Sequence, residues 1–149
     1  MRIEPVVAGY AFNENKTLLV FHKKLQMWLP VGGHIEINET PENALEREFK
    51  EETRLKVIAL NKPKVQMQKS IIKQVPLPFY ADVHSVGDHL HYCQYYLCEV
   101  ISRHPVKLNN KELDDFAWFS PGDLFQEKIP KHIKDIGLLA FQKYEGLIK

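Results

Sequence analysis

The sequence contains few of the features that mark exported or membrane proteins. It has two cysteines, Cys93 and Cys98, and no apolar run that approaches the ~18 residues of a membrane span. Both cysteines fall in one expected strand on opposite faces, so they cannot pair with each other. The N-terminal residues lack the apolar core of a signal peptide. We therefore expect a cytoplasmic protein without a membrane partner.

Charge of one sign is not in excess either. Lys and Arg number 20 against 19 Asp and Glu, which gives a formal net charge of +1. Domains that bind nucleic acid usually carry a strong basic excess, so the charge balance argues against a general polyanion binder and leaves only local basic patches open. The length of 149 residues, with 44% hydrophobic and 26% charged residues, predicts a single globular domain over residues 1–149.

Strand and helix patterns alternate along the chain. Apolar runs at 6–12 and 17–21, joined by turn residues, predict a hairpin. Further strands are expected at 55–60, 90–101, 116–119 and within 71–86, where two prolines favour an edge strand or a strand–loop–strand. Thr40 and Pro41 predict a helix that runs to about residue 53, because Thr caps a helix and Pro suits its first turn.

The C-terminal part adds helices. Residues 120–123 resemble a capping box before a short helix, and apolar residues at helical spacing from Ile133 to Leu147 predict an amphipathic helix. The expected strand at 90–101 is apolar at both parities, as in a central strand buried on both faces. Together these elements predict an α/β fold with a mixed β-sheet and helices on both of its faces.

The first expected helix carries an unusual arrangement of acids. With Ala44 at about 0° on a helical wheel, Leu45 falls near 100° and Phe49 near 140°. Glu48 then falls near 40° and Glu52 near 80°, inside the apolar arc, with Glu51 at its edge. Buried carboxylates that lie together repel and lose hydration. The pattern therefore indicates a bound hard divalent cation such as Mg²⁺ or Mn²⁺, although a solvated or purely structural acidic helix is the alternative.

The segment from Gly33 to Leu55 resembles the Nudix box. The family pattern has Gly, five residues, Glu, seven residues, Arg-Glu, an apolar residue, any residue, Glu-Glu, any residue, Gly and an apolar residue. Here Gly33, Glu39, Arg47-Glu48 and Glu51-Glu52 match every charged position. Arg54 stands where the family usually has Gly, which puts the end of the helix in question. The resemblance implies a Nudix-type α/β/α sandwich.

The resemblance also implies roles for these residues. Nudix proteins hydrolyse a nucleoside diphosphate linked to another group with the help of divalent cations. Carried onto this chain, Glu51 and Glu52 would be the main metal ligands, Glu48 a ligand or general base, and the Gly32 carbonyl a further ligand. Arg47 would orient the glutamates and Glu39 would brace the loop. Many members add a loop carboxylate, for which Glu112, Asp114 and Asp115 are the candidates.

Histidines and aromatic residues are the remaining candidates for the site. Asp82, His84, Asp88, His89 and His91 lie close together in sequence, but their spacing matches no structural zinc pattern. We expect His89 and His91 to share a strand face and to line the substrate cleft. Trp28, Phe79, Tyr80 and Tyr92 are candidates to stack on a nucleobase, although such residues are more often core.

The resemblance to the Nudix family implies a Mg²⁺- or Mn²⁺-dependent hydrolase, and we expect it to convert a nucleoside triphosphate to the monophosphate and pyrophosphate. Two alternatives stay open: a nucleotide-sugar or ADP-ribose pyrophosphatase, and a non-catalytic nucleotide-binding sensor. The expected partner is a small nucleotide rather than a nucleic acid. The resemblance also leaves a homodimer open, although no residue identifies its interface.

Overall fold

Alternating side chains on the central strands create two apolar cores, one on each face of a single sheet. The computed structural model describes residues 1–148. Its elements are β1 (Ile3–Asn13), β2 (Lys16–His22), β3 (Met27–Leu29), β4 (Val31–His34), α1 (Pro41–Thr53), β5 (Val57–Ala59), β6 (Tyr80–Ser85), β7 (Leu90–Val100), β8 (Leu113–Phe119), the 3₁₀ turn η1 (Gly122–Leu124) and α2 (Lys131–Ile148).

The eight strands form one mixed sheet. β1 runs parallel to β7, and the other pairs are antiparallel. The main order is β3-β2-β1-β7-β5, with β4 on β1, β6 on β7 and β8 on β2. The hairpin expected from the first two apolar runs is confirmed, because β1 and β2 pair across the turn from Asn13 to Lys16.

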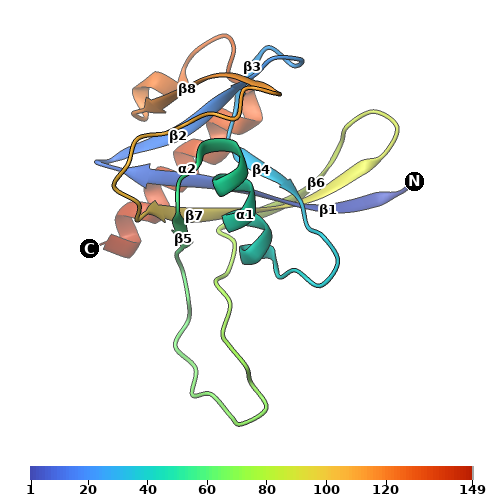
Figure 1. Cartoon of the computed structure of the whole chain (residues 1–149), viewed down its shortest axis with the longest axis vertical. Helices are drawn as coiled ribbons and strands as arrows, with labels where there is room; N and C mark the ends of the chain where they lie inside the picture. The colour runs from blue at the N-terminus through green and yellow to red at the C-terminus, as the bar shows by residue number, and fades with distance from the viewer. Residues whose placement is uncertain (149) are drawn as a thin grey trace.

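Each face of the sheet is covered by one helix (Figure 1). Tyr10 and Phe12 of β1 pack with α2, whereas Val7 and Ala11 pack with α1. This arrangement confirms the predicted α/β fold with helices on both faces. The free cysteines are buried in opposite cores, Cys93 on the α2 side and Cys98 on the α1 side. Neither helix in residues 1–148 offers the long apolar stretch that a bilayer crossing needs.

Two expectations for the strands need correction. Within 71–86 only Tyr80–Ser85 is a strand, and residues 60–79 form a long excursion that projects away from the sheet (Figure 1). Pro76 and Pro78 explain the late start, since proline cannot donate to a ladder. β7 is central but not buried on both faces throughout. Its first residues extend beyond the two cores, and Tyr92 is exposed.

Helix α1 has a capping residue at each end, Thr40 at the N-terminus and Arg54 at the C-terminus. The Thr40 hydroxyl accepts a hydrogen bond from the backbone N–H of Asn43, whose side chain accepts one from the Thr40 N–H. At the other end Arg54 adopts the left-handed conformation, with φ of 64°, and its N–H donates to the Lys50 carbonyl. The helix therefore ends as it would with glycine, although an L side chain in this conformation costs about 1 kcal/mol.

Replacing Arg54 by glycine should relieve this strain. We expect Arg54→Gly to exceed Arg54→Ala in free energy of unfolding by about 1 kcal/mol, because alanine keeps the left-handed penalty while losing the same side chain. Urea unfolding of the two variants measures the difference. Equal stabilities would show that the backbone at this position carries no strain.

Candidate functional site

A cavity of about 450 Å³ lies beside α1, and carboxylates dominate its wall. We call it the carboxylate cavity. Its lining residues are His22, Gly32, Gly33, His34, Glu36, Glu48, Glu51, Glu52, Asn109, Lys111, Glu112 and Leu113. Three of them come from α1, four from β4 and the loop that follows it, and the others from β2 and the segment that leads into β8. The cavity thus joins elements that are far apart in sequence.

The paired glycines of β4 let α1 lie close to the sheet. A Cβ on Gly32 would overlap the Val7 carbonyl of β1, and a Cβ on Gly33 would overlap the Glu48 carboxylate. Neither Gly32 nor Gly33 has a positive φ. Close approach, rather than a special turn, is therefore why this position of β4 needs glycine.

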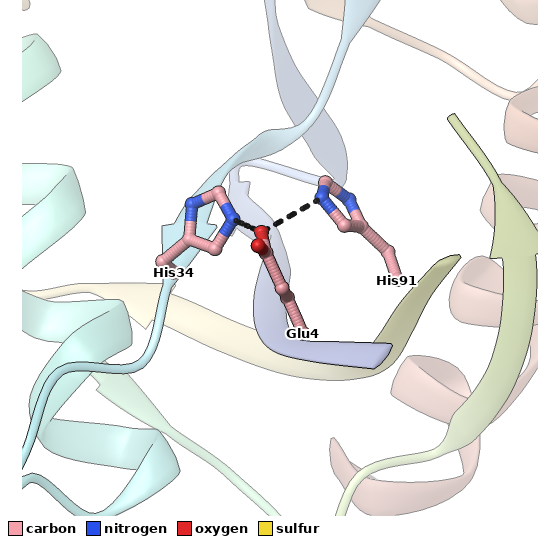
Figure 2. A group of neighbouring side chains, drawn as sticks. All are labelled: Glu4, His34 and His91. Atoms are coloured by element: carbon pink, nitrogen blue, oxygen red, sulfur yellow. Dashed lines mark hydrogen bonds and ion pairs between the residues drawn. The ribbon is translucent and has the colours of Figure 1, made fainter. Parts of the chain in front are cut away.

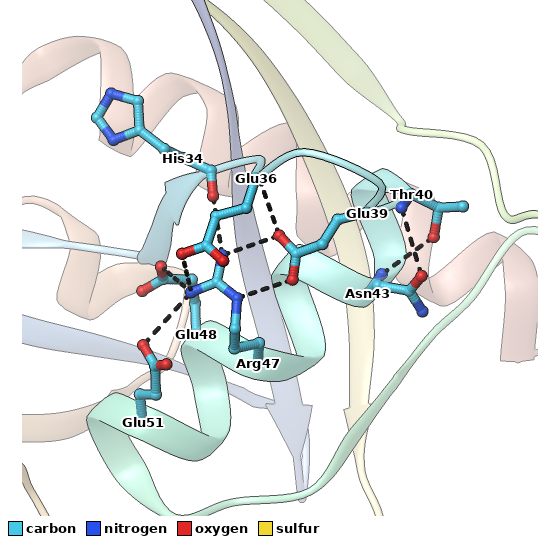
Figure 3. A network of polar contacts seen from close by, with 8 residues as sticks. All are labelled: His34, Glu36, Glu39, Thr40, Asn43, Arg47, Glu48 and Glu51. Atoms are coloured by element: carbon cyan, nitrogen blue, oxygen red, sulfur yellow. Dashed lines mark hydrogen bonds and ion pairs between the residues drawn. The ribbon is translucent and has the colours of Figure 1, made fainter.

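Arg47 connects the loop before α1 to the glutamates of the helix (Figure 3). Its guanidinium donates to both carboxylate oxygens of Glu39, from Nε at 2.8 Å and from Nη2 at 3.0 Å. Nη1 donates to Glu48 Oε1 at 2.9 Å and to Glu51 Oε2 at 3.4 Å. Nη2 also donates to the His34 carbonyl at 2.9 Å. One planar cation therefore fixes a loop, a strand end and two acids.

Glu39 in turn closes the loop. Its Oε1 accepts a hydrogen bond from the Glu36 backbone N–H at 2.9 Å. The hydrogen bonds from Arg47 hold the pKa of Glu39 below its usual range, with the Glu36 N–H acting in the same direction. Glu39 is thus a charged brace that lies outside the lining of the carboxylate cavity.

Glu52 is the most unusual acid of the group. Its Oε2 is buried and accepts no hydrogen bond. Burial raises the pKa of Glu52 to about 9, and the negative charge of Glu48 acts in the same direction. Burial also raises the pKa of Glu48, although the hydrogen bond from Arg47 opposes it. Without a cation, the pair is therefore more stable with one of the two carboxyl groups protonated than with both ionised.

The other predicted acids divide into two groups. Glu51 points toward solvent, with 57% of its side chain exposed, and still lines the carboxylate cavity. Glu112 lines it too, and its charge contributes to the raised pKa of Glu52. Asp114 lies 3.9 Å from the Lys23 amino group instead, and Asp115 accepts from the Phe116 N–H. Of the three candidate loop carboxylates, the structure brings only Glu112 to the cavity.

The four predicted substrate-binding residues lie outside the lining of the carboxylate cavity. Trp28 packs edge-on between the rings of Phe21 and Phe119. Tyr80, at the start of β6, lies against Tyr95. Stacking of either ring on a nucleobase stays a prediction, as does substrate binding by His89 and His91.

His89 and His91 lie with Glu4 and His34 in a second polar group, which we call the histidine cluster. Figure 2 shows three of its members, Glu4, His34 and His91. Ligand atoms of Glu4, His34 and His91 all lie within 4.8 Å of one another. His91 is in β7, but His89 precedes that strand. Asp82 does not join them and accepts from His84 instead, at 2.8 Å.

Sequence reasoning missed several residues of the carboxylate cavity. His22, Asn109 and Lys111 gave no signal, because neither position nor spacing linked them to the box. His22 ends β2 at an irregularity in the pairing with β8, and such bulges often lie next to functional sites. Burial lowers the pKa of His22, with Glu112 opposing.

Comparisons with known proteins point to one family. The model of the NUDIX domain matches residues 2–139. A hydrolase of the NUDIX family from Clostridium perfringens shares 29% identity, with 97% of this chain and 99% of that chain covered and a TM-score of 0.84. A MutT NUDIX hydrolase from Burkholderia pseudomallei has a TM-score of 0.69 at 16% identity, with 95% and 98% covered.

A third solved structure is an ADP-ribose pyrophosphatase from Streptococcus suis. It has a TM-score of 0.61 at 18% identity, with 95% of this chain and 91% of that chain covered. No curated protein matches the chain in sequence.

The raised pKa of Glu52 makes the stability of the metal-free protein depend on pH. Between 4.5, its ordinary value, and about 9, the folded chain keeps a proton that the unfolded chain has released. The free energy of unfolding therefore falls as pH rises through this range. Glutamine cannot ionise, so folding of Glu52→Gln needs no proton uptake. We therefore expect this variant to be more stable than the unmodified chain in EDTA at about pH 8 by ~1–3 kcal/mol, and by less near pH 5.

Urea unfolding across this pH range measures the effect. Glu51→Gln is the matched control, because its side chain is exposed and its neutralisation removes no buried charge. It should keep the pH dependence of the unmodified chain. Parallel stability curves for the unmodified chain and Glu52→Gln would contradict the raised pKa.

Proposed function

Because this chain belongs to the Nudix hydrolase family, we propose that it hydrolyses a diphosphate bond in a nucleoside diphosphate linked to a further group, with Mg²⁺ or Mn²⁺ as cofactor. The leading substrate is a nucleoside triphosphate, converted to the monophosphate and pyrophosphate. An ADP-ribose or nucleotide-sugar pyrophosphatase is the second candidate, because one structural relative is described as an ADP-ribose pyrophosphatase.

The buried, unpaired Oε2 of Glu52 carries the proposal. A buried carboxylate oxygen without a donor is costly, and a cation that binds there removes the cost. Oxygen ligands with several negative charges suit a hard divalent cation such as Mg²⁺ or Mn²⁺. Glu51 and Glu52 are the main ligands in this proposal, the Gly32 carbonyl and Glu112 are further ones, and Glu48 is a ligand or general base.

A bound divalent cation neutralises the diphosphate and lowers the pKa of attacking water. The chain's own residues supply the rest. Glu48 takes the proton from the water, since burial brings the pKa of this carboxyl upward toward the working pH. Lys111 adds a positive charge to the cavity wall, where it attracts a polyphosphate. Arg47 is a positioning residue that fixes Glu48 and Glu51.

The wider proposal covers the whole chain. Residues 1–149 act as one catalytic domain, since both helices pack on the same sheet. The free thiols of Cys93 and Cys98 suit a reducing cytoplasm. The partner is a small nucleotide, and self-association into a homodimer is tested by light scattering.

A substrate panel tests the proposed reaction. Phosphate and pyrophosphate release is measured on nucleoside triphosphates, oxidised nucleotides, nucleotide sugars, ADP-ribose and dinucleoside polyphosphates, with Mg²⁺ or Mn²⁺. We expect turnover to require the cation and to fall by at least ~100-fold in Glu51→Gln and Glu52→Gln, beyond the loss typical of residues that only support a ligand. Glu46→Gln is the control, because Glu46 is on the same helix but outside the cavity lining.

The outcomes separate the alternatives. Turnover with ADP-ribose but not with triphosphates would move the second candidate to first place. Cation-dependent nucleotide binding without turnover on any substrate would overturn the hydrolase proposal in favour of a sensor. Unchanged cation affinity in both glutamine variants would support a purely structural acidic helix.

Arg47→Lys tests the positioning role. Lysine keeps the charge but cannot form the paired hydrogen bonds to Glu39 while reaching Glu48. We expect kcat to fall by ~10–100-fold and the Mg²⁺ concentration for half-maximal rate to rise, as for the loss of other ligand-orienting residues. Arg54→Lys makes the same chemical change outside the cavity lining and should leave both values unchanged. A lower melting temperature with unaltered Mg²⁺ dependence would show a purely structural role.

A further inference from the structure

The register of the sheet brings the histidine cluster together. Glu4 of β1 stands directly opposite His91 of the parallel strand β7. On the other side of β1, His34 ends β4 opposite Val6. Three neighbouring strands therefore deliver one carboxylate and two imidazoles to the same place, and His89 adds a third imidazole from the turn before β7.

The four side chains converge through their ligand atoms. Glu4 Oε1 lies 2.8 Å from His34 Nε2, 3.2 Å from His89 Nε2 and 3.9 Å from His91 Nε2. The Nε2 atoms of His89 and His91 are 3.2 Å apart (Figure 2 shows His91 with Glu4 and His34). Ligand atoms of a tetrahedral zinc site lie roughly 3.3 Å apart, given Zn–N bonds of ~2.0–2.1 Å. The separations from Glu4 Oε1 and between His89 and His91 bracket that spacing. The ligand atoms of Glu4, His34 and His91 all lie within 4.8 Å of one another, whereas His89 lies outside this three-residue group and approaches it through Glu4 and His91.

The residues around the cluster hold these nitrogen atoms in place. His89 Nδ1 lies 2.7 Å from Asp88 Oδ1, which leaves Nε2 to face Glu4 and His91. A carboxylate on the far nitrogen is the usual support of a metal-binding histidine, because it fixes the ring and its tautomer. The side chains of His89 and His91 are 17% and 19% exposed and that of His34 is 56% exposed, so an ion from solvent can reach the cluster.

From this geometry we infer that Glu4, His34, His89 and His91 form a second cation site, which binds a borderline transition metal such as Zn²⁺ through three imidazoles and one carboxylate. Imidazole ligands favour such ions over Mg²⁺, which prefers oxygen. This site shares only His34 with the lining of the carboxylate cavity, and it does not rest on the proposed hydrolase activity.

Zinc titration of the full chain tests the inference. Isothermal titration calorimetry with ZnCl₂ is run in excess Mg²⁺, which occupies an oxygen-rich site in preference to the imidazoles. We expect one equivalent of Zn²⁺ to bind, and His34→Gln and His91→Gln each to weaken binding by more than ~10-fold, the loss already seen when only an outer partner of a ligand is removed. His104→Gln is the matched control, because His104 is exposed and contacts the Pro105 carbonyl.

Further experiments separate loss of zinc binding from loss of folding and from binding at the carboxylate cavity. Metal-free circular dichroism and unfolding establish that each variant folds, and the intensity of the visible spectrum of bound Co²⁺ reports whether the ion is tetrahedral, as the inference requires. The double variant Glu51→Gln/Glu52→Gln should keep its zinc affinity. The inference is overturned if zinc does not bind, if both histidine variants bind it as the unmodified chain does, or if the double glutamine variant loses it.

Discussion

Two carboxyl groups of like charge, Glu48 and Glu52, are held on the buried side of one helix, and this constraint shapes the elements around them. The wheel position that brings them to the sheet also brings Leu45 and Phe49 into the apolar core. The helix therefore cannot turn its acids to solvent without exposing that core. β4 accommodates them with two glycines, since a side chain on either would strike the neighbouring strand or Glu48 itself. Packing and electrostatics are in conflict here, which is typical of a site built for a ligand.

Arg47 offsets part of this conflict. Among the described residues, Arg47 is the only one whose side chain donates hydrogen bonds to all three of Glu39, Glu48 and Glu51. Contact with these acids raises the pKa of Arg47, so the positive charge is permanent. Arg47 does not reach the unpaired oxygen of Glu52. The Arg47 guanidinium therefore orients the acids but leaves one oxygen of Glu52 without a hydrogen bond. A second positive charge beside Glu52 would compensate that oxygen.

The sequence was sufficient wherever a local pattern determined the structure. Helical spacing placed Glu48 and Glu52 inward, Thr40 and Pro41 marked the helix start, and β7 was identified as central from its two apolar faces. Prediction failed where strands from distant parts of the chain meet. Nothing in the spacing joined Lys111 or His22 to the box, and the expected set around Asp82 missed Glu4 and His34. Sheet register creates such neighbours, and no local periodicity encodes it.

His34 links the two polar groups through different atoms. Its backbone carbonyl accepts from Arg47 at the edge of the carboxylate cavity, while its imidazole contacts Glu4 in the histidine cluster. The two groups nevertheless differ in donor chemistry, one rich in carboxylate oxygen and the other in imidazole nitrogen. Hard and borderline cations are sorted by this difference more than by charge, because both kinds of ion are divalent. The strand Val31–His34 thus contributes to both groups. In the two proposals each group takes a different class of cation, so that filling one need not compete with filling the other.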